Sequence, residues 1–310
     1  SGFAPAQVYA PLVACAFVLA SNASGGAADV RLTEALVVSD ALVECAVPAV
    51  AAPTTARIEL RAPAGQEPAA LLVLETFTYY DAGAVRVLAA VPAGGPTGRE
   101  LGAIRVEGTG LADYGGAACS FGAFGRANAS AVLGPGGNVA FECAPPPVLP
   151  TEAPAGASVA VEVSLDGAAF STGSEANFTY FTAAVGAVRP AASPTGAHAL
   201  AVTVSGAGFV HLGGGATCSF WRVVGTAVAA VPELAVNASV ASSTALVCEA
   251  PVRLAAGTFE VRASLDAGRT VLEPVLEHPR LLAYDLAAVA VSRLLPAGGP
   301  VAGGTAVTLE

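Results

Sequence analysis

The sequence predicts an all-β protein made of tandem β-sandwich domains. Two observations carry this prediction. A pattern built around two cysteines recurs three times within the 310 residues, and between the turns hydrophobic residues alternate with polar ones at a period of two. A recurring pattern of this kind is typical of modular chains, and period-two alternation indicates strands that keep one face in water.

The repeated unit is clearest in residues 199–251. An apolar strand and a glycine-rich turn lead there to Cys218-Ser-Phe, and the unit closes on Cys248-Glu-Ala-Pro. The same order of residues occurs twice before it. Those copies carry the pairs Cys119 and Cys143, and Cys15 and Cys45.

Each copy closes on an aromatic strand and runs into the next without a long linker, and the copies after the first open on a proline-containing strand. Proline suits a strand at a sheet edge, and short junctions predict a semi-stiff rod of domains. We expect one domain at 1–81 that lacks its N-terminal strands, two complete domains at 82–182 and 183–284, and the opening strands of a fourth at 285–310.

The best-patterned strands lie in the second half of each copy. In residues 158–166, Val161 and Val163 are expected to face the core and Glu162 the water. Residues 259–266 alternate in the same way. Asp-Gly and Asp-Ala-Gly sequences follow these strands and supply the positive-φ residues that tight hairpins need.

Six cysteines allow 15 pairings, and the repeat selects one pair within each copy. Disulfides indicate an oxidising compartment, and in the chain-entropy model each bridge should contribute roughly 3–4 kcal/mol. The alternative is six free, buried thiols. The expected disulfides are Cys15–Cys45, Cys119–Cys143 and Cys218–Cys248.

Asparagine supports the same compartment. Four of the five asparagines stand in Asn-x-Ser/Thr acceptor sequences, which are sites of N-glycosylation in secreted proteins. We therefore expect covalent N-glycans on an exposed surface. The acceptors are Asn22, Asn128, Asn177 and Asn237.

The charge of the chain argues against nucleic acid as a partner. The formal net charge is −10, all 14 cations are arginine, and no basic run exists to neutralise phosphates. No apolar run reaches the ~20 residues that span a bilayer, so no membrane span is expected in this segment. Residues 10–20 resemble a signal-peptide core, but they align with the first-cysteine strand of the repeat.

The order Pro-x-x-Gly-Pro, Gly-x-Gly-Phe, Cys-x-Phe, Cys-x-x-Pro and Phe-x-Tyr resembles the IPT/TIG module, and the resemblance covers essentially the whole chain. It implies an immunoglobulin-like (E-set) β-sandwich of the kind found in plexin-type receptors, fibrocystin-like surface proteins and some transcription factors. Two departures are evident. The first copy lacks its opening strands, and the third lacks the Phe-x-Tyr pair, which leaves the strand assignment at 270–285 open.

No catalytic, cofactor-binding or metal-binding residue is expected. His198, His211 and His278 stand apart from one another, without metal-ligand spacing, and are interpreted as solvated loop residues. The alternative of calcium at the domain junctions rests on Asp81 and Asp285, but each junction offers one acid at most. The single tryptophan, whose position follows Cys218-Ser-Phe, is expected in the core beside the disulfide, with a sugar-stacking platform as the alternative.

These expectations combine into a non-catalytic extracellular glycoprotein, structural or adhesive, whose tandem domains form a rod or part of a cell-surface filament. Its partners would be other protein chains or copies of itself. The alternative is the stalk of a plexin-like receptor ectodomain. The excess of Ala, Gly, Pro and Arg without Lys or Met predicts a GC-rich, alga-like source with a cell-wall or ciliary-surface location.

Overall fold

The structure is a computed structural model that describes residues 14–19, 29–39, 41–61, 72–152, 157–196, 200–251, 253–285, 288 and 290–310. Asn22 and His198 lie outside these residues. The chain divides into two compact units, 1–84 and 85–310, which are described one at a time. The first unit holds the first repeat, and the second unit holds the remaining two repeats and the C-terminal segment.

The first repeat is a five-stranded antiparallel sheet in the order β3-β2-β1-β4-β5, followed by the short 3-10 helix η1. Cys15, Phe17 and Leu60 form its core together with small alanines. The elements are β1 (Ala14–Leu19), β2 (Val30–Val37), β3 (Val43–Cys45), β4 (Thr54–Arg61), β5 (Leu72–Tyr79) and η1 (Ala82–Ala84).

The second repeat consists of a six-stranded sheet, β13-β9-β10-β11-β8-β6, and a three-stranded sheet, β12-β14-β7. Phe121, Phe141, Phe178 and Tyr180 are fully buried in it. The elements are β6 (Arg86–Val91), β7 (Gly94–Pro96), β8 (Ile104–Thr109), β9 (Ala118–Ser120), η2 (Gly122–Phe124), β10 (Arg126–Leu133), η3 (Pro135–Gly137), β11 (Val139–Cys143), β12 (Ala157–Ala160), β13 (Glu162–Ser164) and β14 (Asn177–Phe181).

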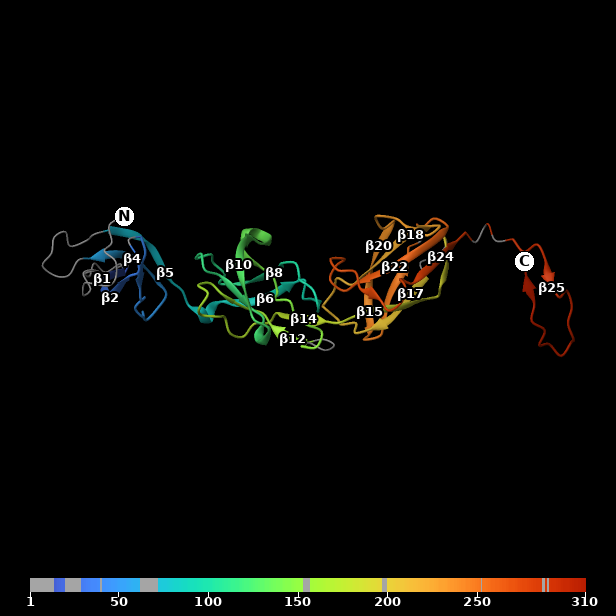
Figure 1. The fold of residues 1–310 in the computed structure, drawn as a ribbon, viewed down its shortest axis with the longest axis horizontal. Helices are drawn as coiled ribbons and strands as arrows, with labels where there is room; N and C mark the ends of the chain where they lie inside the picture. Colours follow the sequence, from blue (N-terminus) through green and yellow to red (C-terminus); the bar gives the residue numbers. More distant parts are fainter. Residues whose placement is uncertain are drawn as a thin grey trace. The chain divides into compact units, whose positions relative to one another are not determined.

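The third repeat has the same strands in one continuous hydrogen-bonded path, β16-β24-β22-β18-β20-β21-β17-β15-β23, with β19 paired to β18. Figure 1 shows β18, β22 and β24 side by side in this repeat. The elements are β15 (Ala184–Arg189), β16 (Ala192–Pro194), β17 (Leu200–Ala207), β18 (Thr217–Val224), β19 (Ala227–Val228), β20 (Leu234–Ser242), β21 (Ala245–Ala250), β22 (Gly257–Ser264), β23 (Glu273–Pro274) and β24 (Arg280–Tyr284).

The third repeat closes without the aromatic pair of the other two. Leu281 takes the core position on β24, and the strand still pairs in parallel with β16 as β14 pairs with β7. The open assignment at 270–285 is therefore resolved as two strands, β23 and β24. After them the chain forms only the small antiparallel pair β25 (Leu294–Leu295) and β26 (Thr308–Leu309), within the part that the structure describes.

One strand in each repeat crosses between the two layers, and we call β2, β10 and β20 the switch strands. In β10, residues 126–128 pair with β9 and residues 129–133 pair with β11. In β20, residues 234–237 pair with β18 and residues 238–242 pair with β21. Each of these two switch strands therefore joins two portions of one hydrogen-bonded path, and we call these portions the two layers. They are β13-β9 and β11-β8-β6 on either side of β10, and β16-β24-β22-β18 and β21-β17-β15-β23 on either side of β20.

The disulfides join the two strands that flank each switch strand. Cys15 of β1 is bonded to Cys45 of β3, and the second and third repeats have the same arrangement. All six cysteines are paired, so the covalent links tie the two layers together where one strand passes between them. The other two bonds are Cys119–Cys143, between β9 and β11, and Cys218–Cys248, between β18 and β21.

Together, these strands make an all-β chain of tandem immunoglobulin-like sandwiches. Sandwiches form because apolar and polar residues alternate along the strands, so that each strand has one face for the core and one for solvent. On β18, Cys218 and Phe220 point into the core while Ser219 and Trp221 point outward, and the other long strands divide their residues between two faces in the same way.

Candidate functional site

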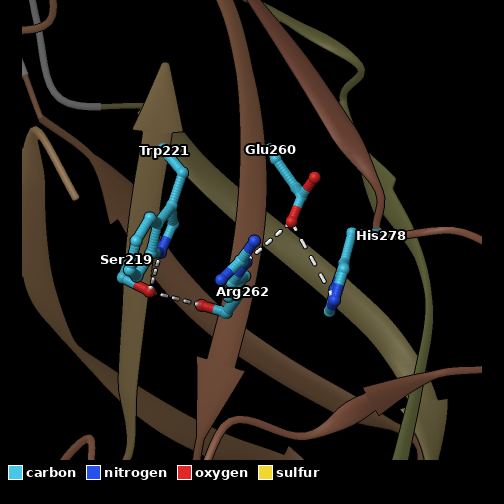
Figure 2. Close-up of polar contacts among 5 residues, drawn as sticks. All are labelled: Ser219, Trp221, Glu260, Arg262 and His278. Carbon is cyan, nitrogen blue, oxygen red and sulfur yellow. Dashed lines mark hydrogen bonds and ion pairs between the residues drawn. The ribbon is translucent and has the colours of Figure 1, made fainter. Parts of the chain in front are cut away.

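The most organised polar surface among the described residues lies on the outer face of β18 and β22, in the third repeat. Two cross-strand pairs define it, because Ser219 lies opposite Arg262 and Trp221 lies opposite Glu260. Figure 2 shows these four side chains with His278, which approaches from the loop before β24. We call these five residues the outer cluster.

Trp221 and Arg262 are stacked. The guanidinium carbon of Arg262 lies 4.3 Å from the centre of the indole ring, within the range of a cation–π contact. The indole Nε1 donates to the Ser219 hydroxyl oxygen at 2.9 Å, and that hydroxyl donates to the Arg262 carbonyl oxygen at 3.3 Å. One serine thus holds the indole N–H on its own strand and the backbone of the arginine on the neighbouring strand.

Glu260 completes the outer cluster. Its Oε1 accepts a hydrogen bond from Nε of Arg262 at 2.7 Å and lies 3.9 Å from Nε2 of His278 (Figure 2). Glu260 is only 6% exposed although it is on the outward face of β22, because the longer side chains cover it. The outer cluster is therefore a ladder of cation, ring and carboxylate whose polar atoms are mostly directed at one another, whereas Nδ1 of His278 is buried without a hydrogen-bond partner.

The first repeat carries a related ladder with the charges in reverse order. Register from the cysteines aligns Glu59 with Arg262 and Arg57 with Glu260, since Cys15 lies opposite Leu60 and Cys218 opposite Ala263. The two oxygens of Glu59 contact Arg57 and Arg61 at 2.6 Å each. The hydrogen bond from Arg61 is the main reason that the pKa of Glu59 lies below its usual value.

The position of the tryptophan corrects an expectation. Sequence reasoning placed Trp221 in the core beside the disulfide, whereas it is partly exposed and lies on the face opposite to Cys218 and Phe220. Side chains alternate along a strand, so Phe220, two residues after the inward Cys218, points inward, and Trp221, three residues after it, points outward. Counting the strand period from Cys218 would have found this.

The acceptor asparagines that the structure describes are all exposed. Asn128 and Asn237 lie on the switch strands β10 and β20, and Asn177 begins β14. Their side chains are thus open to solvent, as an attached sugar requires. Whether sugar is attached stays a prediction.

The histidines and junction acids that the structure describes have separate local surroundings. His211 is exposed in a loop and accepts a hydrogen bond from the Gly213 amide at 3.2 Å, and the Asp81 carboxylate accepts one from Gly83 at 2.8 Å. The described residues contain no group of three or more His, Cys, Asp or Glu side chains suited to a metal ion. His278 is the exception to the solvated-loop interpretation, since its side chain is 23% exposed and packs near Glu260.

Sequence reasoning missed two features of the site. The first is the ladder around Glu59, in which the charges are in reverse order to those of the outer cluster. The second is that Asn128 and Asn237 occupy equivalent positions, because each lies opposite the residue that precedes the first cysteine of its repeat. Both become visible only when strand register is known. The signal was present as Arg-x-Glu-x-Arg at 57–61 and Glu-x-Arg at 260–262.

No helix in the described part of the chain has the length and apolar character of a membrane span.

Comparison with known proteins gives no family model that matches and no match among curated proteins. Among solved structures, the extracellular region of plexin A4 is similar at 12% identity and a TM-score of 0.41, over 92% of this chain and 27% of that one. A Bacteroides ovatus glucan-utilisation protein, SGBP-B, is similar at 13% identity and a TM-score of 0.27, over 88% and 60%. The FN1–FN3 domains of chicken CNTN1 follow at 11% identity and 0.24, over 85% and 86%. The chain thus spans about a quarter of the plexin A4 chain.

Proposed function

We propose that this protein is a non-catalytic, extracellular structural or adhesive glycoprotein, in which tandem IPT/TIG-type sandwiches act as a rigid spacer. The observation that carries the proposal is the disulfide across each switch strand. Three small domains each place their one covalent link where the two layers would otherwise separate. Such bridges persist outside the cell and are rare in the reducing cytosol.

The described side chains support a structural role. The outer cluster and the ladder around Glu59 satisfy their charges internally. They therefore stiffen a sheet face and offer no activated nucleophile or general base. Faces of this kind suit a domain that holds its shape and separates other parts of an assembly.

Contacts between the second and third repeats support a stiff spacer. Within the unit 85–310, Arg99 lies 3.3 Å from the Glu273 carboxylate, and Arg269 donates to the Ala103 carbonyl oxygen at 3.2 Å. The two arginines come from different repeats, so the junction is held from both sides. We propose the domain limits 1–81, 82–182, 183–284 and 285–310 for this array.

The partners proposed are other protein chains or further copies of this one. A receptor stalk is the second candidate because the sandwiches would serve equally as a spacer between a ligand-binding head and a membrane. A transmembrane helix in the full reading frame would favour the stalk, and a long further array of the same repeats would favour the filament.

The proposal is tested on protein secreted by its native cells or by a eukaryotic host. We expect a peptide N-glycosidase to lower its mass, and all six cysteines to react with an alkylating agent only after reduction. A mass that the glycosidase leaves unchanged, or cysteines that alkylate without reductant, would contradict an extracellular glycoprotein. The native location is checked by protease shaving of intact cells.

A further inference from the structure

The switch strands leave sheet edges open. Each half of β10 pairs with one neighbour only, β9 or β11, and each half of β20 pairs only with β18 or β21. Among the described residues no other strand pairs with β10 or β20. At the start of the second halves, the Ala129 amide donates to the Ala117 carbonyl oxygen at 2.9 Å and the Ala238 amide donates to the Ala216 carbonyl oxygen at 2.8 Å. Beyond these two bonds, the second side of each half presents backbone N–H and C=O groups to which another strand could add.

These edges carry only part of the usual protection against strand addition: Arg105 donates to the Leu133 carbonyl oxygen at 3.3 Å at the end of β10, and β20 has a bulge. Natural edges are blunted by charges, prolines, bulges or a covering segment. Residues 129–133, Ala-Ser-Ala-Val-Leu, and 238–242, Ala-Ser-Val-Ala-Ser, contain no charge and no proline. Leu133 is 75% exposed at the end of its strand, and β20 has one bulge between Val240 and Ser242.

A glycan acceptor stands at the switch point of both strands. Asn128 is the last residue of the half that pairs with β9, and Asn237 is the last residue of the half that pairs with β18. The residue after each lies opposite the second cysteine of its repeat, Cys143 or Cys248. A sugar on either asparagine would project from the exposed face at the junction of the two open edges.

The first repeat has a different residue at the same place. Glu34 of β2 lies opposite Ala14, the residue before Cys15, and Ala35 lies opposite Cys45. The register therefore makes Glu34 the counterpart of Asn128 and Asn237. Here the switch point carries a charge, which is one of the ordinary means of edge protection.

We propose that N-glycans on Asn128 and Asn237 guard the open edges of β10 and β20 against strand addition by a second copy of this chain. A second copy is the expected intruder because every chain presents two uncharged edges of the same pattern, which can pair with each other antiparallel. The inference rests on the glycosylation proposed above. It assigns these two sugars a task that the third described acceptor, Asn177, does not share.

Asn177 supplies the matched control. It begins β14, which is paired on both sides, with β12 and with β7. A sugar there guards no open edge, so its loss should not change association. The Asn177→Gln variant therefore controls for the general effect of losing one glycan.

The experiment compares four secreted chains: wild type, Asn128→Gln/Asn237→Gln, Asn177→Gln and Asn128→Glu/Asn237→Glu. Light scattering after size exclusion gives the concentration at which each self-associates, and hydrogen exchange gives protection of residues 126–133 and 234–242. We expect the Gln double variant to associate at a concentration about tenfold lower than wild type, with new protection in both strands. Asn177→Gln should match wild type, and the Glu double variant should also match it because a charge replaces the sugar.

The possible failures are distinguishable. Unoccupied sequons in the wild-type mass spectrum would overturn the proposed glycosylation and this inference with it. Occupied sequons together with a Gln double variant that associates no more readily than wild type would overturn the guard alone. If the Gln double variant associates without new protection in β10 and β20, surfaces other than these edges cause the association. The same conclusion follows if the Glu double variant associates as readily as the Gln double variant. Because the bulge already hinders pairing at β20, the single change Asn128→Gln should promote self-association more than the single change Asn237→Gln.

Discussion

At the scale of single residues, the two buried glutamates of the described part of the chain are each paired with arginine. Glu59 is 4% exposed and lies between Arg57 and Arg61. In the third repeat, Glu260 takes a similar place beneath Arg262. A carboxylate can be covered in this way only because it receives charge-assisted hydrogen bonds that replace those of water.

The contacts around Glu59 predict a pH dependence of stability. Because the folded-state pKa of Glu59 lies below the ordinary value of 4.5, its stabilisation is fully present above pH 4.5 and is lost as pH falls through the lower folded value. The Glu59→Gln variant should be about 2 kcal/mol less stable than wild type at pH 7, and this difference should shrink in acid. Calorimetry from neutral pH into the acid range below 4.5 measures it.

Glu44 provides the control for this measurement. It is exposed on β3 of the same repeat. A Glu44→Gln change should leave the unfolding temperature of the first repeat nearly unchanged at neutral pH. A Glu59 variant that differs from wild type by the same amount in neutral and acid solution would contradict the role given to the Arg57–Glu59–Arg61 contacts.

At the scale of the element, the switch strand is the feature on which each sandwich depends. It joins the two layers through the backbone, and the disulfide joins its two neighbours through side chains. β10 itself contributes few buried side chains, since its residues alternate between partly buried and exposed. The position of β10 is therefore held more by its backbone hydrogen bonds to β9 and β11 and by the Cys119–Cys143 disulfide than by side-chain packing.

Removal of one bridge tests this dependence. The Cys119→Ala/Cys143→Ala variant should lose roughly 3 kcal/mol from the stability of the second repeat, the amount expected for closing a loop of this length. Limited proteolysis should then cut first within β10, while the first and third repeats keep their wild-type transitions. Unchanged cleavage of β10 would show that the backbone pairing alone holds the switch strand. In the matching variant, Cys218→Ala/Cys248→Ala, the loss of stability should occur in the third repeat instead of the second.

At the scale of the whole molecule, the chain combines an acidic, lysine-free composition with repeats joined by short junctions. Within the unit 85–310, Arg99 and Arg269 connect the second repeat to the third. An exposed ion pair such as Arg99–Glu273 contributes about 0–1 kcal/mol, so contacts of this kind orient neighbouring domains more than they stabilise them.

The Arg99→Ala/Arg269→Ala variant tests the junction. We expect stability to change by less than about 1 kcal/mol. Backbone relaxation measured by NMR should nevertheless separate the tumbling of the two repeats, which should move together in wild type. Arg253→Ala, an exposed arginine away from the junction contacts, is the control. Identical tumbling in the double variant and wild type would show that other contacts hold the repeats together.

The all-β class could be predicted without a structure, because strand periodicity is local and the cysteine pattern repeats along the chain. The sequence also indicated the alternation of residues 259–266, most of which lie in β22, since each residue's face follows from its neighbours. The single strand expected at 158–166 was wrong, because these residues divide into β12 and β13, which belong to different sheets. The acceptor asparagines are equally readable from three adjacent residues.

Which residues meet across strands could not be predicted from local sequence. The stack of Arg262 on Trp221, the match of Glu34 with Asn128 and Asn237, and the closing role of Leu281 all depend on register between segments far apart in sequence. Register is set by the packing of a whole sandwich, and a shift of one residue would turn every side chain of a strand to the other face. No local pattern contains that information.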